Sequence, residues 1–243
     1  MASISLNLNL APSSYGSSAY SSGSDVSGYT SADIAALTVK QVGSLTTTQV
    51  AALDPAAFAG FTTAQIPALS ANSLTVVSSA QLSNLSNDQL GSFKATQLKS
   101  ISTANIASLS TSQISAIKGT QITGLTTDQV QALSTAQLVQ VETTDLAAMR
   151  TAQIAALTTT QVGALTGAQV IALTTAQAAA LTTDQVQALS TAQLVQVETT
   201  DLAAMKTAQI AALTTTQVGA LTGAQVIGLT AAQAAALTTD QVQ

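Results

Sequence analysis

The sequence is built on an eight-residue repeat, L-T-x-x-Q-[V/I]-x-A, which is clearest in the consecutive copies at residues 157–164 and 165–172. The register runs from Tyr29 to Gln243 without an insertion, through 26 complete octads and most of another. We number the octad from its leucine. Because the period constrains every residue after Tyr29, it decides which architectures are open to the chain.

Large apolar residues recur at octad positions 1 and 6. Position 1 is apolar in all 27 copies, and position 6 is Val, Ile, Leu or Phe everywhere except Ala178 and Ala234. One long helix is excluded, because eight residues at about 100° each rotate the pattern by about 80° per octad, and no apolar stripe persists. An uninterrupted strand is excluded as well, because positions 1 and 6 have opposite parity and would point to opposite faces.

Each octad also carries a helix-start signal. Position 2 is Ser, Thr or Asp in 21 of 27 copies, and position 5 is mostly Gln. This spacing is a capping box, in which the hydroxyl accepts from the third helical N–H and the Gln reaches back to the N–H of the cap residue. The dipeptide Asp54-Pro55 supports the same register, because Pro is favoured at the first helical position.

The repeat therefore predicts a mostly α solenoid. Each octad forms one helical segment of one to two turns, followed by a corner at positions 8, 1 and 2. Such a segment is too short to be stable alone, so it must bury positions 1 and 6 against neighbouring segments. Position 8 is usually Ala, Gly or Ser, which predicts that adjacent coils approach closely there.

The residues before the repeat have a different pattern. Residues 3–10 alternate between apolar and polar side chains, which predicts a short β-strand. Three interpretations stay open for it: a cap over the first coils, a strand donated to another subunit, or a disordered segment. Residues 11–28 are rich in Ser, Gly and Tyr, which is typical of a flexible linker.

The octads divide into two regions of one continuous domain. Copies over 29–124 are degenerate, whereas those over 125–243 are nearly identical. Residues 125–187 and 181–243 match at 60 of 63 positions, with an offset of seven octads. A duplicated seven-octad block explains this match, and it implies that the length of the array matters more than any one position.

Few residues are candidates for chemistry. The chain has no His and no Cys, which removes the commonest bases, thiol nucleophiles and zinc ligands. Glu142 with Asp145, repeated as Glu198 with Asp201, occupies the cap and the third helical position, so we predict helix capping for these carboxylates. The sequence therefore predicts no catalytic, cofactor-binding or metal-binding residue, and a protein that is not an enzyme.

Charge and hydropathy exclude other classes. Six scattered basic residues and a net charge of −5 argue against binding to nucleic acid. No apolar run approaches about 18 residues, so no membrane span is predicted. The first residues, 1–4, do not begin an ordinary signal peptide.

Self-association is the partner that the pattern favours. The last octad stops at position 7 without a polar cap, which indicates either a piece of a longer array or an end covered by another copy. In the second case, two unlike apolar ends meet head to tail, and the N-terminal strand clips onto the neighbour. The residues expected to take part are Ile4, Leu6, Leu8, Leu10, Tyr29, Ile34, Leu237 and Val242.

The run from Leu173 to Gln185 resembles the tandem L-T-x-x-Q-[V/I] repeats of large bacterial surface and secreted adhesin-like proteins, and the resemblance covers roughly residues 30–243. It implies an extracellular, elongated structural protein without an active site, exported in one step. We expect a filament subunit or rigid spacer. The alternative is an adhesin stalk or binding scaffold whose edge holds a surface or carbohydrate partner. A ladder of Thr at positions 2 and 3 that binds ice is a third hypothesis.

Overall fold

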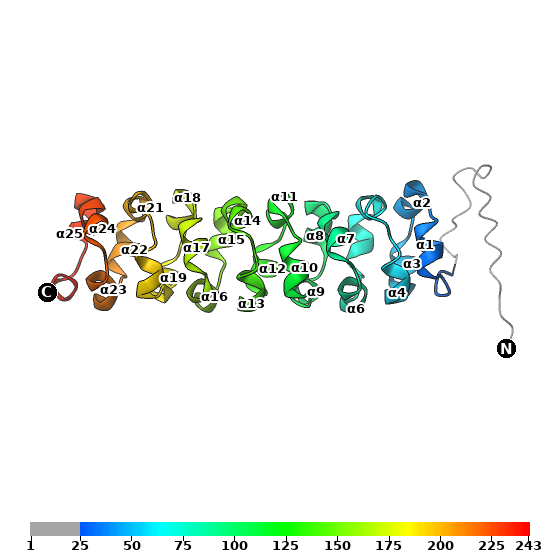
Figure 1. Ribbon diagram of the computed structural model, residues 1–243, viewed down its shortest axis with the longest axis horizontal. Helices are drawn as coiled ribbons and strands as arrows, with labels where there is room; N and C mark the ends of the chain where they lie inside the picture. The colour runs from blue at the N-terminus through cyan, green and yellow to red at the C-terminus, as the bar shows by residue number, and fades with distance from the viewer. Residues whose placement is uncertain (1–24) are drawn as a thin grey trace.

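The computed structural model describes residues 25–243, which form one rod of short helices that follow each other along a single axis (Figure 1). Over these residues the secondary structure is helical, with no strand. The prediction of a mostly α chain with one short helix per octad is therefore confirmed. The strand predicted over residues 3–10 lies outside the described residues.

Nearly every octad contributes one α-helix of four to six residues, and two octads contribute a 3₁₀ helix instead. The elements in chain order are α1 (Ser31–Ala35), α2 (Val39–Gly43), α3 (Thr47–Ala52), α4 (Pro55–Phe58), η1 (Ile66–Ala68), α5 (Ala71–Leu74), α6 (Ser79–Ser83), α7 (Asn87–Gly91), α8 (Ala95–Ser100), α9 (Thr103–Ala107), α10 (Thr111–Ser115), α11 (Gly119–Ile122), α12 (Thr127–Gln131), α13 (Thr135–Leu138), α14 (Thr143–Ala148), α15 (Thr151–Ala155), α16 (Thr159–Ala164), α17 (Gly167–Ile171), α18 (Thr175–Ala178), α19 (Thr183–Ala188), α20 (Thr191–Leu194), α21 (Thr199–Ala204), α22 (Thr207–Ala211), α23 (Thr215–Gly219), α24 (Gly223–Gly228), α25 (Ala231–Ala235) and η2 (Thr239–Gln241).

The capping box sets the start of most helices. In α16, the N–H of Gln161 donates to Thr158 Oγ1 at 3.1 Å, and the N–H of Thr158 donates to Gln161 Oε1 at 2.8 Å. These bonds satisfy two of the backbone donors that a helix start leaves without partners. Asp54 and Pro55 take the predicted cap and first helical positions, although the Asp54 side chain makes no capping hydrogen bond.

Octad positions 1 and 6 form one continuous apolar column along the axis. Every position 6 side chain from Ile34 to Ile210 is buried, as is every position 1 side chain from Leu37 to Leu213. Each helix is too short to fold alone, so burial against the neighbouring coils stabilises it.

One coil of the solenoid contains between three and four octads. Helices pack against the helix three octads further along the chain, as α16 does with α19, whose first residues are 183 − 159 = 24 apart. The hydrogen bonds that position 5 glutamines such as Gln161 donate to the preceding coil span 28 to 31 residues, and 28 residues are three and a half octads.

The glutamine at octad position 5 holds successive coils together. Gln161 is buried, and its Nε2 donates to the carbonyls of Val130 at 3.0 Å and Leu133 at 2.7 Å. These carbonyls lie at the end of a helix in the preceding coil, where carbonyls lack partners within the helix. One side chain therefore caps the start of its own helix and the end of a helix in the coil before. The octad pattern predicts only the first of these roles.

The same bond recurs along the rod, and we call this set the glutamine ladder. Each member donates to the carbonyl of the residue 28 positions earlier; the members are Gln65, Gln81, Gln89, Gln97, Gln113, Gln121, Gln129, Gln137, Gln153, Gln161, Gln169, Gln177, Gln185, Gln193, Gln209, Gln217, Gln225, Gln233 and Gln241.

Octad position 8 contacts octad position 3 of the preceding coil. A Cβ added at Gly60 would lie 2.3 Å from the carbonyl oxygen of Ser31, and one at Gly124 would lie 2.5 Å from that of Ala95. In both pairs the glycine comes three octads and five residues later in the sequence than the residue that it contacts. The predicted close approach at position 8 is therefore confirmed, and at these two glycines it leaves no room for a larger side chain.

The packing of the repeat begins before the first predicted octad. Val26 is buried, and the N–H of Tyr29 donates to its carbonyl at 3.0 Å. The equivalent bond joins the N–H of Leu37 to the carbonyl of Ile34 in the next octad. Val26 thus takes octad position 6, so the prediction that the linker extends to residue 28 is wrong for residues 26–28.

Candidate functional site

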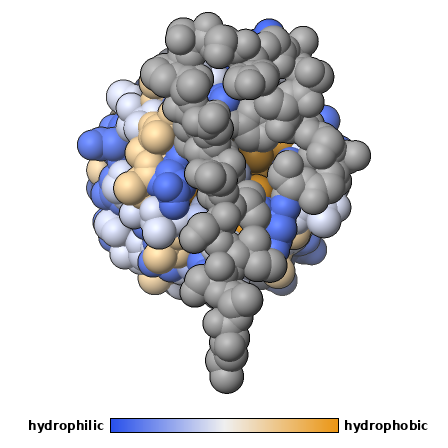
Figure 2. Space-filling view, turned by 90° about the vertical axis from the view of Figure 1, so that its right-hand side faces the viewer, coloured by the Kyte–Doolittle hydropathy of each residue, from blue (hydrophilic) through white to orange (hydrophobic). Residues whose placement is uncertain are grey.

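The N-terminal end of the rod differs from the prediction. Figure 2 looks onto this end and shows an apolar patch near its centre. Ile34 is fully buried and Tyr29 is half-buried, so the prediction that Ile34 is an exposed residue of this end is wrong. The reason is that position 6 points toward the axis, and α1 packs against α4. Residues 4, 6, 8 and 10 of the assembly prediction lie outside the described residues.

The C-terminal end exposes apolar side chains. Val242 is 64% exposed, as its place in the last octad predicts, whereas Leu237 is half-buried against the core. Val226 and Ile227 of α24 are 52% and 86% exposed, and the octad pattern does not predict this exposure. A coil of three to four octads explains them, because a helix is covered by the helix three octads later, and among the described residues none covers α24.

Hydrogen-bonding groups at the two ends are complementary. At the N-terminal end, Gln41 Oε1 accepts from the N–H of Thr38 at 2.7 Å, while its Nε2 has no partner among the described residues. At the C-terminal end, the carbonyls of Leu221 and Leu229 accept no glutamine amide from the described part of the chain. One end therefore offers an amide donor, and the other offers acceptors of the kind that the glutamine ladder binds.

Two octads of the regular region carry Asp instead of Gln at position 5. Asp145 is 6% exposed, the backbone N–H of Gly119 donates to its carboxyl, and its Oδ2 has no hydrogen-bond partner. Burial raises the pKa of Asp145 above its ordinary value. At Asp201, the equivalent residue seven octads later, Thr175 Oγ1 donates to Oδ1 at 2.7 Å.

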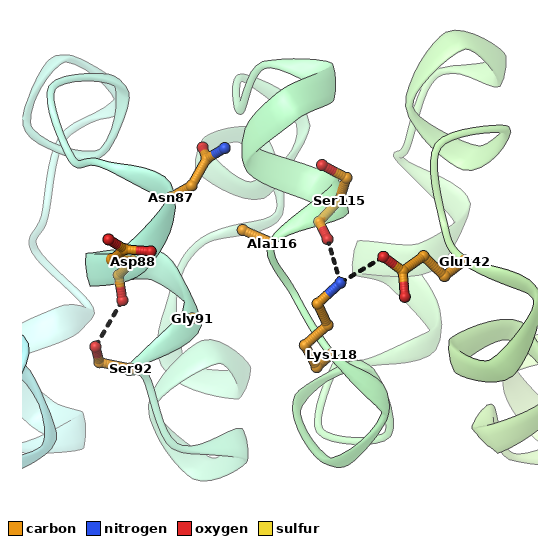
Figure 3. A pocket seen from close by; sticks show the side chains of 8 residues that line it. All are labelled: Asn87, Asp88, Gly91, Ser92, Ser115, Ala116, Lys118 and Glu142. Atoms are coloured by element: carbon orange, nitrogen blue, oxygen red, sulfur yellow. Dashed lines mark hydrogen bonds and ion pairs between the residues drawn. The ribbon is translucent and has the colours of Figure 1, made fainter.

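A shallow hollow on the surface of the rod contains Lys118 and Glu142 (Figure 3). Lys118 Nζ forms an ion pair with Glu142 Oε1 at 2.6 Å and donates to the carbonyl of Ser115 at 3.1 Å. This pairing raises the pKa of Lys118, and both side chains are about half exposed. The hollow is lined by Asn87, Asp88, Gly91, Ser92, Ser115, Ala116, Lys118 and Glu142.

The capping role predicted for the glutamates is wrong. Glu142 and Glu198 stand at the N-cap positions of α14 and α21, but neither side chain makes a capping hydrogen bond. Glu142 instead turns to Lys118 in the preceding coil. The partner residues Asp145 and Asp201 face the preceding coil, as the glutamines do, so they form no capping box with the glutamates.

The chemistry of the hollow is limited. An amine whose pKa is raised by a carboxylate stays protonated at neutral pH and is a poor nucleophile. Within residues 25–243, no group of three or more acidic, His or Cys side chains could hold a metal ion. In the same part of the chain, no helix has the length and apolar character that crossing a membrane requires.

Comparison with known sequences supports the repeat. The model of the family described as "ALTTAQ repeat" matches residues 30–63, 138–175 and 194–231, which together are less than half of the chain. All three segments lie within the residues that follow the octad repeat. No curated protein matches the sequence. The chain is therefore a tandem repeat protein of helical octads.

Proposed function

We propose that this chain is a non-enzymatic structural protein, a rigid spacer or filament subunit that lies outside the cell or at its surface and assembles head to tail. The observation that carries the proposal is the glutamine ladder, which joins each coil to the preceding one in the same way from Gln65 to Gln241. A rod built from equivalent joints has a length set by the number of octads. That property is the one a spacer needs.

Rigidity of the rod is supported by its joints. At the ladder positions from Gln65 to Gln233, a buried amide donates to a carbonyl of the preceding coil, and an unmade bond of this kind costs about 1–3 kcal/mol. Opening the rod at any point breaks several such bonds and exposes the apolar column. The duplicated block over residues 125–243 is consistent with this role, because adding octads lengthens the rod without changing its cross-section.

Head-to-tail assembly is supported by the two ends. Val226, Ile227 and Val242 present apolar surface, and burying such surface contributes about 25 cal/mol per Å², from which the cost of association is subtracted. The Gln41 amide of a second copy would meet the acceptor carbonyls of this end. A contact between unlike ends does not have to close on itself, so it propagates into a filament.

The experiment is to measure the length of particles formed by the purified chain, by electron microscopy and sedimentation velocity at increasing concentration. A double variant, Ile227→Asp with Val242→Asp, places charge on the C-terminal end. We expect end-to-end polymers from the parent chain and single rods from the double variant.

The matched control is Ile171→Asp, because Ile171 is 45% exposed on the side of the rod, at the same octad position as Ile227. This control should polymerise like the parent. If the parent chain stays monomeric at high concentration, or if the double variant polymerises equally, head-to-tail assembly is wrong. A monomer that binds a specific surface or carbohydrate would instead support the adhesin stalk.

A further inference from the structure

The glutamine ladder is interrupted inside the rod at Asp145. A glutamine at octad position 5 donates to carbonyls 28 and 31 residues earlier, as Gln161 does to Leu133 and Val130. The corresponding carbonyls for position 145 belong to Ile117 and Ile114. An ionised carboxylate has no hydrogen to donate to them, and it would be repelled by their oxygen atoms.

The surroundings of Asp145 leave one oxygen unsatisfied. Its side chain is buried, one donor comes from the backbone N–H of Gly119, and Oδ2 has no partner. Lys118 Nζ donates to the carbonyl of Ser115. Ser115 precedes Asp145 by the same number of residues as Gln131 precedes Gln161. Gln161 makes the corresponding bond to the carbonyl of Gln131. The lysine thus replaces part of what a glutamine would supply.

Few charged groups act on Asp145. Its helix, α14, packs against α11 and α17, whose residues carry no charge. Lys118, just before α11, and Glu142, just before α14, contribute opposite electrostatic effects. Arg150 stands at position 2 of the next octad, but its guanidinium donates to the carbonyl of Leu125. The carboxyl therefore lies in an environment that favours its neutral form.

We propose that Asp145 is protonated in the folded rod and that its Oδ2 hydroxyl donates to the preceding coil in place of the missing glutamine amide, which makes this joint sensitive to pH. A protonated carboxyl has one donor and one acceptor side, as a glutamine amide does. The proposal concerns stability, so it does not rest on the function proposed above.

The direction of the pH effect follows from the pKa. Burial raises the pKa of Asp145 in the folded chain above the ordinary 3.8. The folded state then binds more protons than the unfolded state between these two values. Its stabilising effect is fully present below the unfolded pKa and is lost as the pH rises through the folded pKa.

The test compares the parent chain with Asp145→Asn. Asparagine supplies a donor at every pH, and Asn105 already donates in this way to the carbonyl of Val77, 28 residues earlier. We expect the melting temperature of the variant to exceed that of the parent by a margin that widens as the pH rises. The matched control is Asp201→Asn, because Thr175 already supplies a donor to Asp201. Its margin should not widen in the same way.

A direct titration separates protonation from folding. The carboxyl ¹³Cγ resonance that is present in the parent and missing from Asp145→Asn is assigned to Asp145. The pKa obtained from its titration in the parent should lie above the ordinary value for aspartate. Lys118→Met should move that titration to higher pH, and Glu142→Gln should move it to lower pH. A titration at or below the ordinary value, a margin that does not change with pH, or a titration that neither neighbour moves would each overturn the proposal.

Discussion

The degenerate octads over residues 29–124 and the nearly identical octads over 125–243 form coils of the same kind, although they fill octad position 5 differently. The first region has Ala57, Ser73 and Asn105 among its glutamines. Ser73 Oγ donates to the carbonyl of Leu45 at 3.1 Å, and Asn105 Nδ2 donates to that of Val77, both 28 residues earlier. Ser73 and Asn105 therefore supply the same kind of donor as the glutamines of both regions, although the chemical group differs.

Ala57 shows what happens when the donor is missing. Its octad also lacks the hydrogen bond of the cap, because Asp54 makes none. Close by, Phe58 and Phe61 are buried, with ring centroids 5.3 Å apart and an interplanar angle of 85°. Edge-to-face aromatic pairs contribute about 0.5–1.5 kcal/mol beyond their buried area. At Ala57, apolar packing thus takes the place of the polar contacts that the other octads make.

The largest effect is expected at the apolar column. Val162→Asp buries a charge without a partner in a fully buried position, which should cost roughly 4 kcal/mol of unfolding free energy. Val226 also stands at octad position 6 but is half-exposed, so Val226→Asp should change the unfolding free energy by no more than about 1 kcal/mol. Urea unfolding followed by circular dichroism measures both. Equal costs would contradict the assignment of the column.

A smaller effect is expected at the glutamine ladder. Gln161→Glu keeps the acceptor for the cap but removes the donor to Val130 and Leu133, which should cost about 1–3 kcal/mol. Both changes are made in the Ile227→Asp, Val242→Asp background, which we expect to stay as single rods. Gln41→Glu is the control there, because the Nε2 of Gln41 has no partner within the described chain. Thermal melts at neutral pH compare the two. If the control loses as much as Gln161→Glu, the bond between coils contributes nothing.

The smallest effect is expected at the caps. Thr158→Ala removes the acceptor for the N–H of Gln161 and should cost on the order of 1 kcal/mol. Thr159→Ala, at the exposed first helical position, should be almost neutral. A melting difference between these neighbours isolates the hydroxyl of the cap. An equal loss for both would show that threonine at position 2 acts through something other than capping.

Much of the fold could be predicted from the sequence, because its determinants are local. The capping box of Thr158 and Gln161 and the apolar spacing of Leu157 and Val162 lie within one octad. The number of octads in a coil could not be predicted in this way, since it depends on how the corners of several successive octads accumulate. For the same reason, the second role of Gln161 could not be predicted from one octad. The signal in the sequence was that position 5 is mostly glutamine and not glutamate. Either side chain can accept the hydrogen bond of the cap, but only the amide of glutamine can also donate one.

The ends and the acidic residues were predicted less well. Ile34 and Val242 both occupy octad position 6, yet only Val242 is exposed. Whether a position 6 side chain is buried depends on whether a helix three octads away in the sequence packs over it. Glu142 fits a cap by its position in the octad, but Lys118 of the preceding coil pairs with it. In each case the deciding contact is between coils, and a pattern with a period of one octad does not contain it.

The most direct test of the coil uses the absence of cysteine from the chain. A Cβ added at Gly228 would lie 3.3 Å from the Cβ of Thr199, which is close to the separation that a disulfide needs. The pair Thr199→Cys with Gly228→Cys should therefore form a crosslink rapidly under mild oxidation. Control pairs that combine Thr199→Cys with Ala220→Cys or Ala236→Cys, one octad earlier or later, should stay reduced. Equal crosslinking in all three pairs, or crosslinking only in a control, would contradict a coil in which residues between three and four octads apart lie side by side.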